Sequence, residues 1–142
     1  MNKQDVRPKV SKIVFDSSAV LAMILKEPGG ERVETALDAT SQGAGTEIAI
    51  SSVNWCEVLT KLQRGPALLT PEELAGILSG VEVVPFERND AELAAQLNLR
   101  SPFISLGDRA CLSLASLRKA TAWTTDKIWS RVRAGVAIEI LR

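Results

Sequence analysis

The chain has 142 residues, of which 46% are hydrophobic and 24% are charged, a size and composition typical of one globular domain. Lys plus Arg and Asp plus Glu both number 17, so the net charge is zero. The chain therefore lacks the excess of positive charge that would indicate a nucleic-acid partner. The sequence contains no histidine, which excludes Ser-His-Asp catalysis, Cys-His catalysis and zinc sites built on histidine.

Strands and helices are predicted to alternate along the chain. Residues 1–11 are polar and predict a flexible lead-in, which leaves a single domain over residues 12–142. In the first half we predict a strand at 12–16, a helix capped by Ser17 or Ser18 that ends at residues 28–30, and a second helix from 31 to about 39. A strand at 47–50 follows, and then a helix capped by Ser51 or Ser52 that ends at residues 64–66. Those of the second half are a helix from Pro71 to Gly80, a strand at 81–84, a helix from Asn89 or Asp90 to Leu97, a helix over 108–117, a strand at 120–123, a helical turn around Trp129 and a strand at 136–140.

The first strand is apolar over three consecutive residues, without the alternation of a strand that faces water on one side. Such a strand is covered on both faces and belongs in the middle of a parallel sheet. The alternation of strands and helices therefore predicts a three-layer α/β/α fold with a five-stranded parallel sheet. For a doubly wound order of 3-2-1-4-5, the first strand is central and the switch point falls between strands one and four.

Four acids stand at, or within a turn of, a junction where a strand or loop enters an apolar helix. They are Asp16, Glu57, Asp108 and Asp126. Right-handed crossovers bring all such junctions to one edge of a parallel sheet, so the four carboxylates are expected to converge there. Taken singly, Asp108 and Asp126 are better explained as helix caps, and Glu57 as a complement to a helix dipole. Asp16 is costly to bury without a partner, and the four acids together favour a site.

Four carboxylates in one pocket repel one another unless a counter-charge is present. Mg²⁺ or Mn²⁺ is the expected counter-charge because hard cations prefer oxygen ligands and complete their shell with water and substrate phosphate. Such a cation lowers the pKa of a water molecule and stabilises charge on a phosphodiester. The acids therefore predict phosphodiester hydrolysis without histidine. Seven basic residues are of a kind that usually forms solvated surface charges, but several of them are expected near the carboxyl edge of the sheet, where they are candidates to hold RNA phosphates. They are Lys61, Arg64, Arg118, Lys119, Lys127, Arg131 and Arg133.

The cellular compartment is predicted from the cysteines and the N-terminus. Cys56 and Cys111 lie in apolar helical patterns and are expected to be small buried side chains, which suits a reducing cytoplasm. No apolar run approaches the roughly 20 residues that span a bilayer, and the polar residues 1–9 do not form a signal peptide. A cytoplasmic protein without a membrane partner is therefore expected.

The ordered motifs of this sequence resemble those of the PIN-domain ribonucleases and, among them, the VapC-type toxins of bacterial toxin–antitoxin systems. The matching segments are residues 14–22 with 27–29, 50–58, 106–115, 124–129 and 136–142. The resemblance implies a compact five-stranded α/β/α fold and a Mg²⁺- or Mn²⁺-dependent endoribonuclease that cuts structured RNA such as tRNA or rRNA. It also implies a homodimer that a small VapB-type antitoxin neutralises.

The same resemblance assigns roles to individual residues. Asp16, Glu57, Asp108 and Asp126 match the family's acidic quartet, which holds one or two metal ions. By the same resemblance, Ser17 and Thr124 take the places of supporting hydroxyl residues, while Arg109 fits a Gly-Asp-Arg variant of the third motif. Arg109 and Lys127 are candidate contacts to phosphate or to the antitoxin.

Two functions from other classes stand beside the ribonuclease. A receiver-like regulatory domain also places acids and Mg²⁺ at the ends of parallel strands, but it expects an acid pair after strand one and an aspartate after strand three. Here Asp16 is followed by Ser17 and Ser18, and strand three by Pro85 and Phe86. A non-catalytic binding module that holds a peptide in the same groove is the second alternative, and a ribonuclease assay with and without EDTA distinguishes it from the enzyme.

Overall fold

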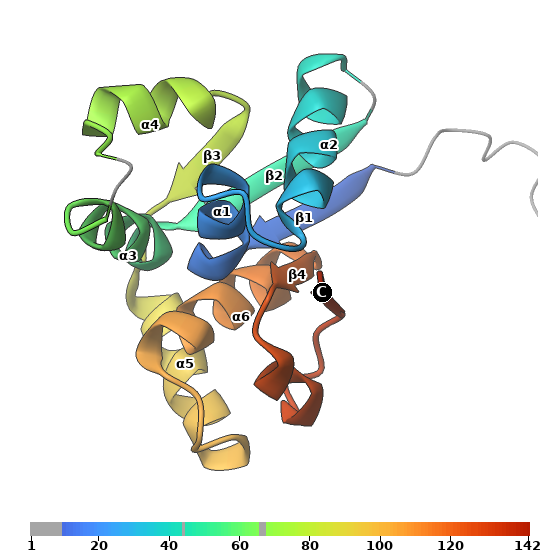
Figure 1. Cartoon of the computed structure of the whole chain (residues 1–142). Helices are drawn as coiled ribbons and strands as arrows, with labels where there is room; N and C mark the ends of the chain where they lie inside the picture. The colour runs from blue at the N-terminus through green and yellow to red at the C-terminus, as the bar shows by residue number, and fades with distance from the viewer. Residues whose placement is uncertain (1–9, 44, 66–67) are drawn as a thin grey trace, which may run out of the picture.

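The chain forms a three-layer α/β/α structure, seen in a computed structural model that describes residues 10–43, 45–65 and 68–142 (Figure 1). The strands of these described residues make one parallel sheet in the order β3-β2-β1-β4-β5. The predicted fold class and the predicted order 3-2-1-4-5 are therefore confirmed. Most of the expected lead-in, residues 1–9, lies outside the described residues, as does Pro66 of the expected stop.

The strands of the sheet are β1 (Ser11–Phe15), β2 (Thr46–Ser51), β3 (Val81–Val84), β4 (Thr121–Thr124) and β5 (Ile138–Ile140). β1 is central, with β2 on one side and β4 on the other. Its last residue, Phe15, is in register with Ile50 of β2 and with Trp123 of β4. The residue after β1 therefore emerges between the carboxyl ends of two neighbouring strands, where open parallel sheets bind ligands.

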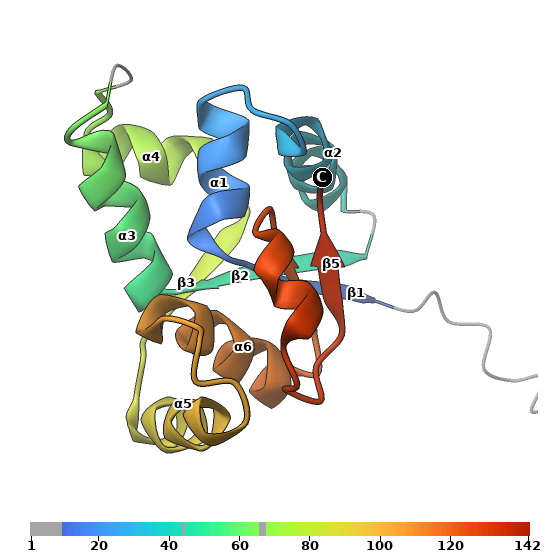
Figure 2. The same cartoon turned by 60° about the horizontal axis from the view of Figure 1, so that its bottom comes forward.

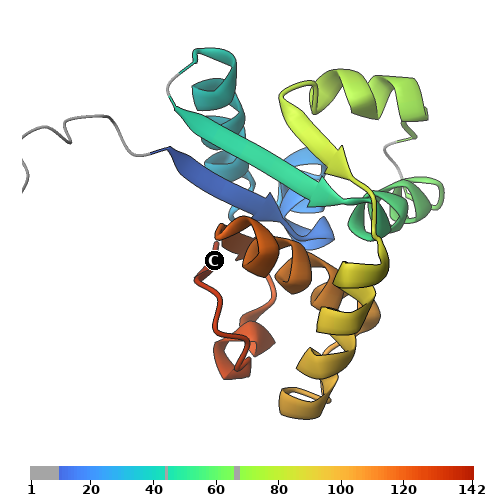
Figure 3. The ribbon, with the colours of Figure 1, turned by 180° about the vertical axis from the view of Figure 1, so that it is seen from behind.

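The helices are α1 (Ser17–Ile24), α2 (Gly30–Ser41), α3 (Ser52–Leu62), α4 (Pro71–Ile77), α5 (Arg88–Arg100), α6 (Leu106–Arg118) and the 3₁₀ turn η1 (Lys127–Arg131). The helices α1 to α4 cover one face of the sheet, while α5 and α6 cover the other (Figure 2). Seen from behind, α5 and α6 form a hairpin that packs beneath β1 and β2 (Figure 3). The site described below draws residues from both helical layers.

Two hydrophobic cores lie on the two faces of the sheet, because successive side chains of a strand point to opposite faces. Ile13 and Phe15 of β1 enter the first core, and Val14 between them enters the second. The largest fully buried members of the first core are Phe15, Val20, Val33, Ile50, Val58, Leu62, Leu74 and Leu78. Those of the second are Val14, Leu112, Leu114 and Trp129. Burial of each side chain of this kind contributes about 1.5–3 kcal/mol, which fixes α3 and α6 firmly against the central strands.

Several local predictions are confirmed. The helix expected to begin at Pro71 does begin there, and a capping box holds its start, with the Thr70 hydroxyl accepting from the Glu73 amide at 3.1 Å. Ser51 caps α3 by accepting a hydrogen bond from the backbone N–H of Val53. The helical turn around Trp129 is η1, and the side chain of Trp129 is buried.

Four local predictions are wrong. The position that caps α1 is occupied by Asp16, not by a serine, because the chain bends into the helix directly after the strand. α5 begins earlier than expected because Glu87 and Asp90 form a reciprocal capping box. Glu57 lies in the second turn of α3, one turn deeper than expected. Cys56 is exposed, because it lies on the side of α3 that faces away from the core.

Candidate active site

Asp16 is buried at the carboxyl end of the central strand, where only 3% of the residue is exposed to solvent. Its Oδ2 atom accepts one hydrogen bond from the Ser18 hydroxyl at 2.8 Å and one from the Thr124 hydroxyl at 3.0 Å. These two donors come from the first turn of α1 and from the end of β4. They hold the carboxylate between β1 and β4, which is the topological switch point of a sheet with this strand order.

The two hydroxyl groups also fix the loop that carries the last acid of the quartet. The Ser18 and Thr124 oxygens are 3.1 Å apart, and Ser18 accepts from the backbone N–H of Thr125 at 3.0 Å. The Thr124 hydroxyl accepts from the backbone N–H of Asp126 at 3.1 Å. Asp126 is exposed, and its Oδ1 caps η1 by accepting from Ile128 at 3.0 Å. Asp16 and Asp126 are thus linked through one network of small hydroxyl side chains.

Glu57 reaches the site from α3, on the opposite face of the sheet from α6. Its Oε1 accepts a hydrogen bond of 2.9 Å from the side-chain amide of Asn54, which stands one helical turn earlier. The Glu57 carboxylate lies directly against the α-carbon of Gly107, in the first turn of α6. Glu57 is therefore placed beside the helix that carries the next acid.

Asp108 stands in that first turn of α6, in a capping box with Ser105. The Ser105 hydroxyl accepts from the Asp108 amide at 3.1 Å, and Asp108 Oδ2 accepts from the Ser105 amide at 3.2 Å. The N-cap of α6 is therefore Ser105 and not Asp108, and Asp108 completes the capping box from the third helical position. The cap also fixes the direction in which its partly buried carboxyl group points.

The electrostatics of the acids indicate that they lie close together. Burial raises the pKa of Asp16 to about 7, and the negative charges of Asp108 and Glu57 add to this effect, while its hydrogen bonds from Ser18 and Thr124 oppose it. Burial also raises the pKa of Asp108; its bonds with Ser105 oppose the shift, and the charges of Asp126 and Glu57 add to it. Each acid of the quartet thus acts on at least one other.

The quartet suits a hard divalent cation in its chemistry, since all its donors are carboxylate oxygens and no positive side chain of the described residues contributes to the pKa of Asp16. The acids are near neighbours without forming a ready-made cage. Across the described ranges, no three carboxylate or thiol side chains stand close enough to hold a metal ion. Ligation by the quartet would therefore need side-chain rotation or bridging water.

A groove of about 680 Å³ runs from Glu57 between α1 and α3. Its walls combine apolar side chains with charged groups of both signs. They include Ser17, Leu21, Leu25, Glu27, Cys56, Glu57, Thr60, Lys61, Leu62 and Arg64. Lys61 and Arg64 therefore share this groove with Glu57, as expected for side chains that hold phosphate.

Two of the expected supporting contacts, those of Ser17 and Arg109, differ from the structure. Ser17 borders the groove, but the hydroxyl that donates to Asp16 belongs to Ser18, one residue later. The guanidinium of Arg109 turns toward α5, where Nη1 donates to the carbonyl of Ala94 at 3.1 Å, so it packs two helices together. Lys127 is exposed in η1, immediately after Asp126, and remains a candidate contact.

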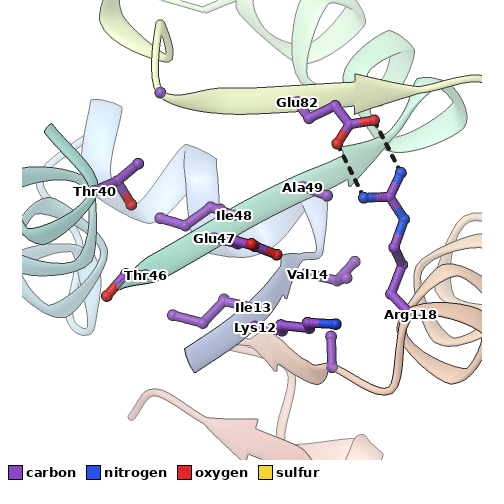
Figure 4. A pocket seen from close by; sticks show the side chains of 12 residues that line it. Lys12, Ile13, Val14, Thr40, Thr46, Glu47, Ile48, Ala49, Glu82 and Arg118 are labelled. Atoms are coloured by element: carbon purple, nitrogen blue, oxygen red, sulfur yellow. Dashed lines mark hydrogen bonds and ion pairs between the residues drawn. The ribbon is translucent and has the colours of Figure 1, made fainter. Parts of the chain in front are cut away.

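A second pocket, of about 240 Å³, lies beside the amino-terminal halves of β1, β2 and β3, away from the acids (Figure 4). Arg118 crosses it to form two hydrogen bonds of 2.9 Å with Glu82 (Figure 4). Lys119 follows Arg118 at the same end of α6, because the helix runs back toward the amino-terminal edge of the sheet. Arg118 and Lys119 are therefore not among the basic residues that lie near the acids.

Ser18 and Asn54 are two site residues to which the sequence interpretation gave no role at the acids. Ser18 is two residues after Asp16, a separation at which a side-chain hydroxyl reaches a neighbouring residue. Asn54 precedes Glu57 by three residues, which places the two side chains on the same side of α3. Helical spacing therefore contained a signal for Asn54, while the contacts of Ser18 with β4 depend on the tertiary fold.

Fold and site together define a three-layer α/β/α protein with an acidic site at the carboxyl edge of a parallel sheet. The family model described as "PIN domain" matches residues 13–135, so the chain belongs to the PIN domain family. This match confirms the family to which the sequence motifs pointed.

Solved structures of toxin–antitoxin complexes and of a toxin share the fold at low sequence identity. A VapBC2 complex from Rickettsia felis, bound to a DNA fragment from its promoter, is 18% identical with a TM-score of 0.70, and the match covers 90% of this chain and 97% of that one. A toxin–antitoxin complex from Klebsiella pneumoniae is 16% identical with a TM-score of 0.70, covering 92% and 98%. VapC20 of Mycobacterium tuberculosis, a toxin that cleaves the sarcin-ricin loop, is 18% identical with a TM-score of 0.63, covering 88% and 96%.

A comparison with curated protein sequences gave no significant match. Within the ranges that the structure describes, every helix is too short or too polar to cross a membrane.

Proposed function

We propose that residues 12–142 form a single PIN domain that acts as a VapC-type toxin, a metal-dependent endoribonuclease that cuts structured RNA such as tRNA or rRNA and so inhibits translation. The observation that carries this proposal is Asp16, an acid at the switch point whose pKa is raised first by burial and then by the charges of Asp108 and Glu57. An acid buried in this way among other acids is a feature of functional sites more than of stable cores.

Asp16, Glu57, Asp108 and Asp126 would hold Mg²⁺ or Mn²⁺ directly or through water. When bound there, the cation supplies charge that activates water and stabilises the phosphodiester. Ser18 and Thr124 orient Asp16 through their hydrogen bonds to Oδ2. Lys61 and Arg64 at the groove, and Lys127 beside Asp126, offer positive charge to the RNA backbone.

The expected partners are a VapB-type antitoxin and a second copy of the chain, in the cytoplasm. Structures with the same fold are toxin–antitoxin complexes, which supports an antitoxin as the partner. The groove beside Glu57 has apolar residues along its length, as a surface that receives a peptide requires. A dimer would offer RNA more surface than one neutral chain.

Cleavage of total RNA by the purified chain tests the proposal. The wild type is expected to cleave with Mg²⁺ or Mn²⁺ and to stop in EDTA. The Asp16→Asn variant, which keeps the volume of the side chain, is expected to lose activity by at least a hundredfold. Mapping of RNA 5′ ends after induction, with this variant as control, then identifies the target. Equal cleavage by wild type and variant would show that a contaminating nuclease, and not this site, cuts the RNA.

The second candidate, a non-catalytic module that binds a peptide in the groove, is favoured by the apolar lining of that groove. It predicts that the wild type binds the product of a neighbouring antitoxin-like gene while leaving RNA intact with either cation. The cleavage assay therefore distinguishes the two functions.

A further inference from the structure

We propose that Asn54 and Gly107 are positioning residues that hold the Glu57 carboxylate against the first turn of α6, next to Asp108. They act as a two-sided cradle, in which Asn54 supplies hydrogen bonds and Gly107 supplies space. This inference goes beyond the proposed function but rests on it for the role of Glu57.

The Asn54 side chain bridges two helices from a fully buried position, with 0% of the residue exposed. Its Nδ2 donates to Glu57 Oε1 at 2.9 Å and to the backbone carbonyl of Gly107 at 2.9 Å. A carboxylate and a carbonyl only accept hydrogen bonds, so the amide nitrogen must be the atom that faces them. Both of its protons are then used, one on the acid and one on α6.

The other end of the same amide has no partner. Asn54 Oδ1 is buried and accepts no hydrogen bond from the described part of the chain. An unsatisfied buried acceptor of this kind opposes folding, so stability is a poor reason for an asparagine here. The role of the side chain therefore rests on Nδ2, whose two hydrogen bonds fix the orientation of Glu57 relative to α6.

Gly107 forms the second side of the cradle. A β-carbon added to Gly107 would overlap Glu57 Oε2 and would lie 2.6 Å from the carboxyl carbon. The groups in the way are the far end of a flexible side chain, not backbone. An alanine at 107 is therefore expected to displace the carboxylate and to leave the helix intact.

The pair of acids that the cradle brings together comes from opposite layers of the fold. Glu57 projects from α3 and Asp108 from α6, and the charge of each contributes to the raised pKa of Asp16. Without the cradle, Glu57 would be free to rotate toward the open groove on its other side. Its contribution at the acids would then fall.

The Gly107→Ala variant separates positioning from folding. Alanine favours a helix over glycine, so the variant is expected to melt at or above the temperature of the wild type. Its kcat for RNA cleavage is expected to fall at least tenfold, with KM changed less than threefold. The matched control is Gly76→Ala in α4, where an added β-carbon meets no atom within 4 Å, and full activity is expected. Activity of Gly107→Ala equal to that of the control would overturn the proposal.

The Asn54→Asp variant tests the other side, since it keeps the shape of the side chain and replaces the donor with a charge that repels Glu57. A similar loss of kcat is expected, and Gly107→Ala should cause little further loss in this background, because both changes act through one carboxylate. Fully additive losses would contradict a shared cradle.

A readout independent of activity separates this proposal from the proposed function. In NMR spectra of the wild type, the Asn54 side-chain amide protons are expected to exchange slowly with solvent, and Glu57→Gln and Gly107→Ala should shift their resonances. If the wild type cuts no RNA but these resonances shift, the proposed function fails and the geometry of the cradle stands. If the resonances stay unchanged in both variants, the cradle itself is disproved.

Discussion

At the scale of single residues, Asp16 opposes stability at a position where the proposed function requires an acid. Its carboxyl group is buried near two other acids, and two hydroxyl donors compensate only in part. The sequence pattern of an apolar strand that ends in an acid was enough to single this residue out. The identity of its partners was not predictable in the same way, because Ser17 and Ser18 differ only in which of them faces β4 once the sheet has formed.

The stability of the metal-free protein is expected to depend on the ionisation of Asp16. Its pKa is about 7 in the folded chain, against a reference of 3.8, so the folded state binds more protons than the unfolded state between these values. Its contribution to the free energy of unfolding therefore falls as pH rises from 4 to 7, by at most about 1.4 kcal/mol per pH unit.

Urea denaturation in EDTA, with Asp16→Asn as the reference, measures this effect. The variant should gain stability relative to the wild type as pH rises through this range, because it has no proton to lose at this site. A difference between the two proteins that stays constant from pH 4 to pH 8 would show that Asp16 does not titrate as the structure indicates.

At the scale of helices and strands, most of the architecture was predictable, while the directions of individual side chains were not. Apolar runs and capping residues located the strands and most helices, and Thr70 with Glu73 is an example in which local sequence decided a helix start. Arg109 is the opposite case. Its place beside Asp108 suggested a phosphate contact, but a helix turns by about 100° per residue, so neighbours in sequence face different parts of the fold.

At this scale we also predict that replacing Gly30 and Gly107 by alanine changes the stability of the fold to different degrees, because the added β-carbon meets different kinds of atoms. At Gly30, where α2 begins, an added β-carbon would overlap the Ala22 carbonyl oxygen and lie 2.8 Å from the Met23 α-carbon. These are backbone atoms of α1, which cannot move without shifting the helix that carries Ser18. Gly30→Ala is therefore expected to cost about 1–3 kcal/mol, whereas Gly107→Ala meets only a flexible carboxylate.

Urea denaturation of the two variants and of Gly76→Ala tests this order of stabilities. Gly30→Ala should be the least stable of the three. If it unfolds at the same urea concentration as Gly76→Ala, then α1 and α2 do not approach as closely as the structure indicates.

At the scale of the whole molecule, the site depends on both cores and on the sheet between them. Asp16 follows the central strand, Glu57 comes from the layer of α1 to α4, and Asp108 comes from the layer of α5 and α6. A ligand that binds these acids therefore binds the folded chain and not the unfolded one. By mass action it must stabilise the entire fold.

Addition of Mg²⁺ is accordingly expected to raise the melting temperature of the wild type. A cation concentration of 100 times the Kd corresponds to about 2.7 kcal/mol, which is several degrees for a chain of this size. Asp16→Asn should lose most of this increase, since it removes a charge from the site. An equal increase in both proteins would mean that the cation binds elsewhere.

The hydrogen bond between Thr124 and Asp16 joins residues that are 108 positions apart, and it has a consequence for the newborn chain. During synthesis Asp16 therefore leaves the ribosome 108 residues before Thr124 of its partner strand β4. Until that strand emerges, the central strand has no neighbour on one side, and neither Thr124 nor Asp126 is present. On the proposed function, whose substrate is RNA of the translation machinery, the nascent polypeptide is therefore expected to be inactive until β4 and the loop that carries Asp126 have been made.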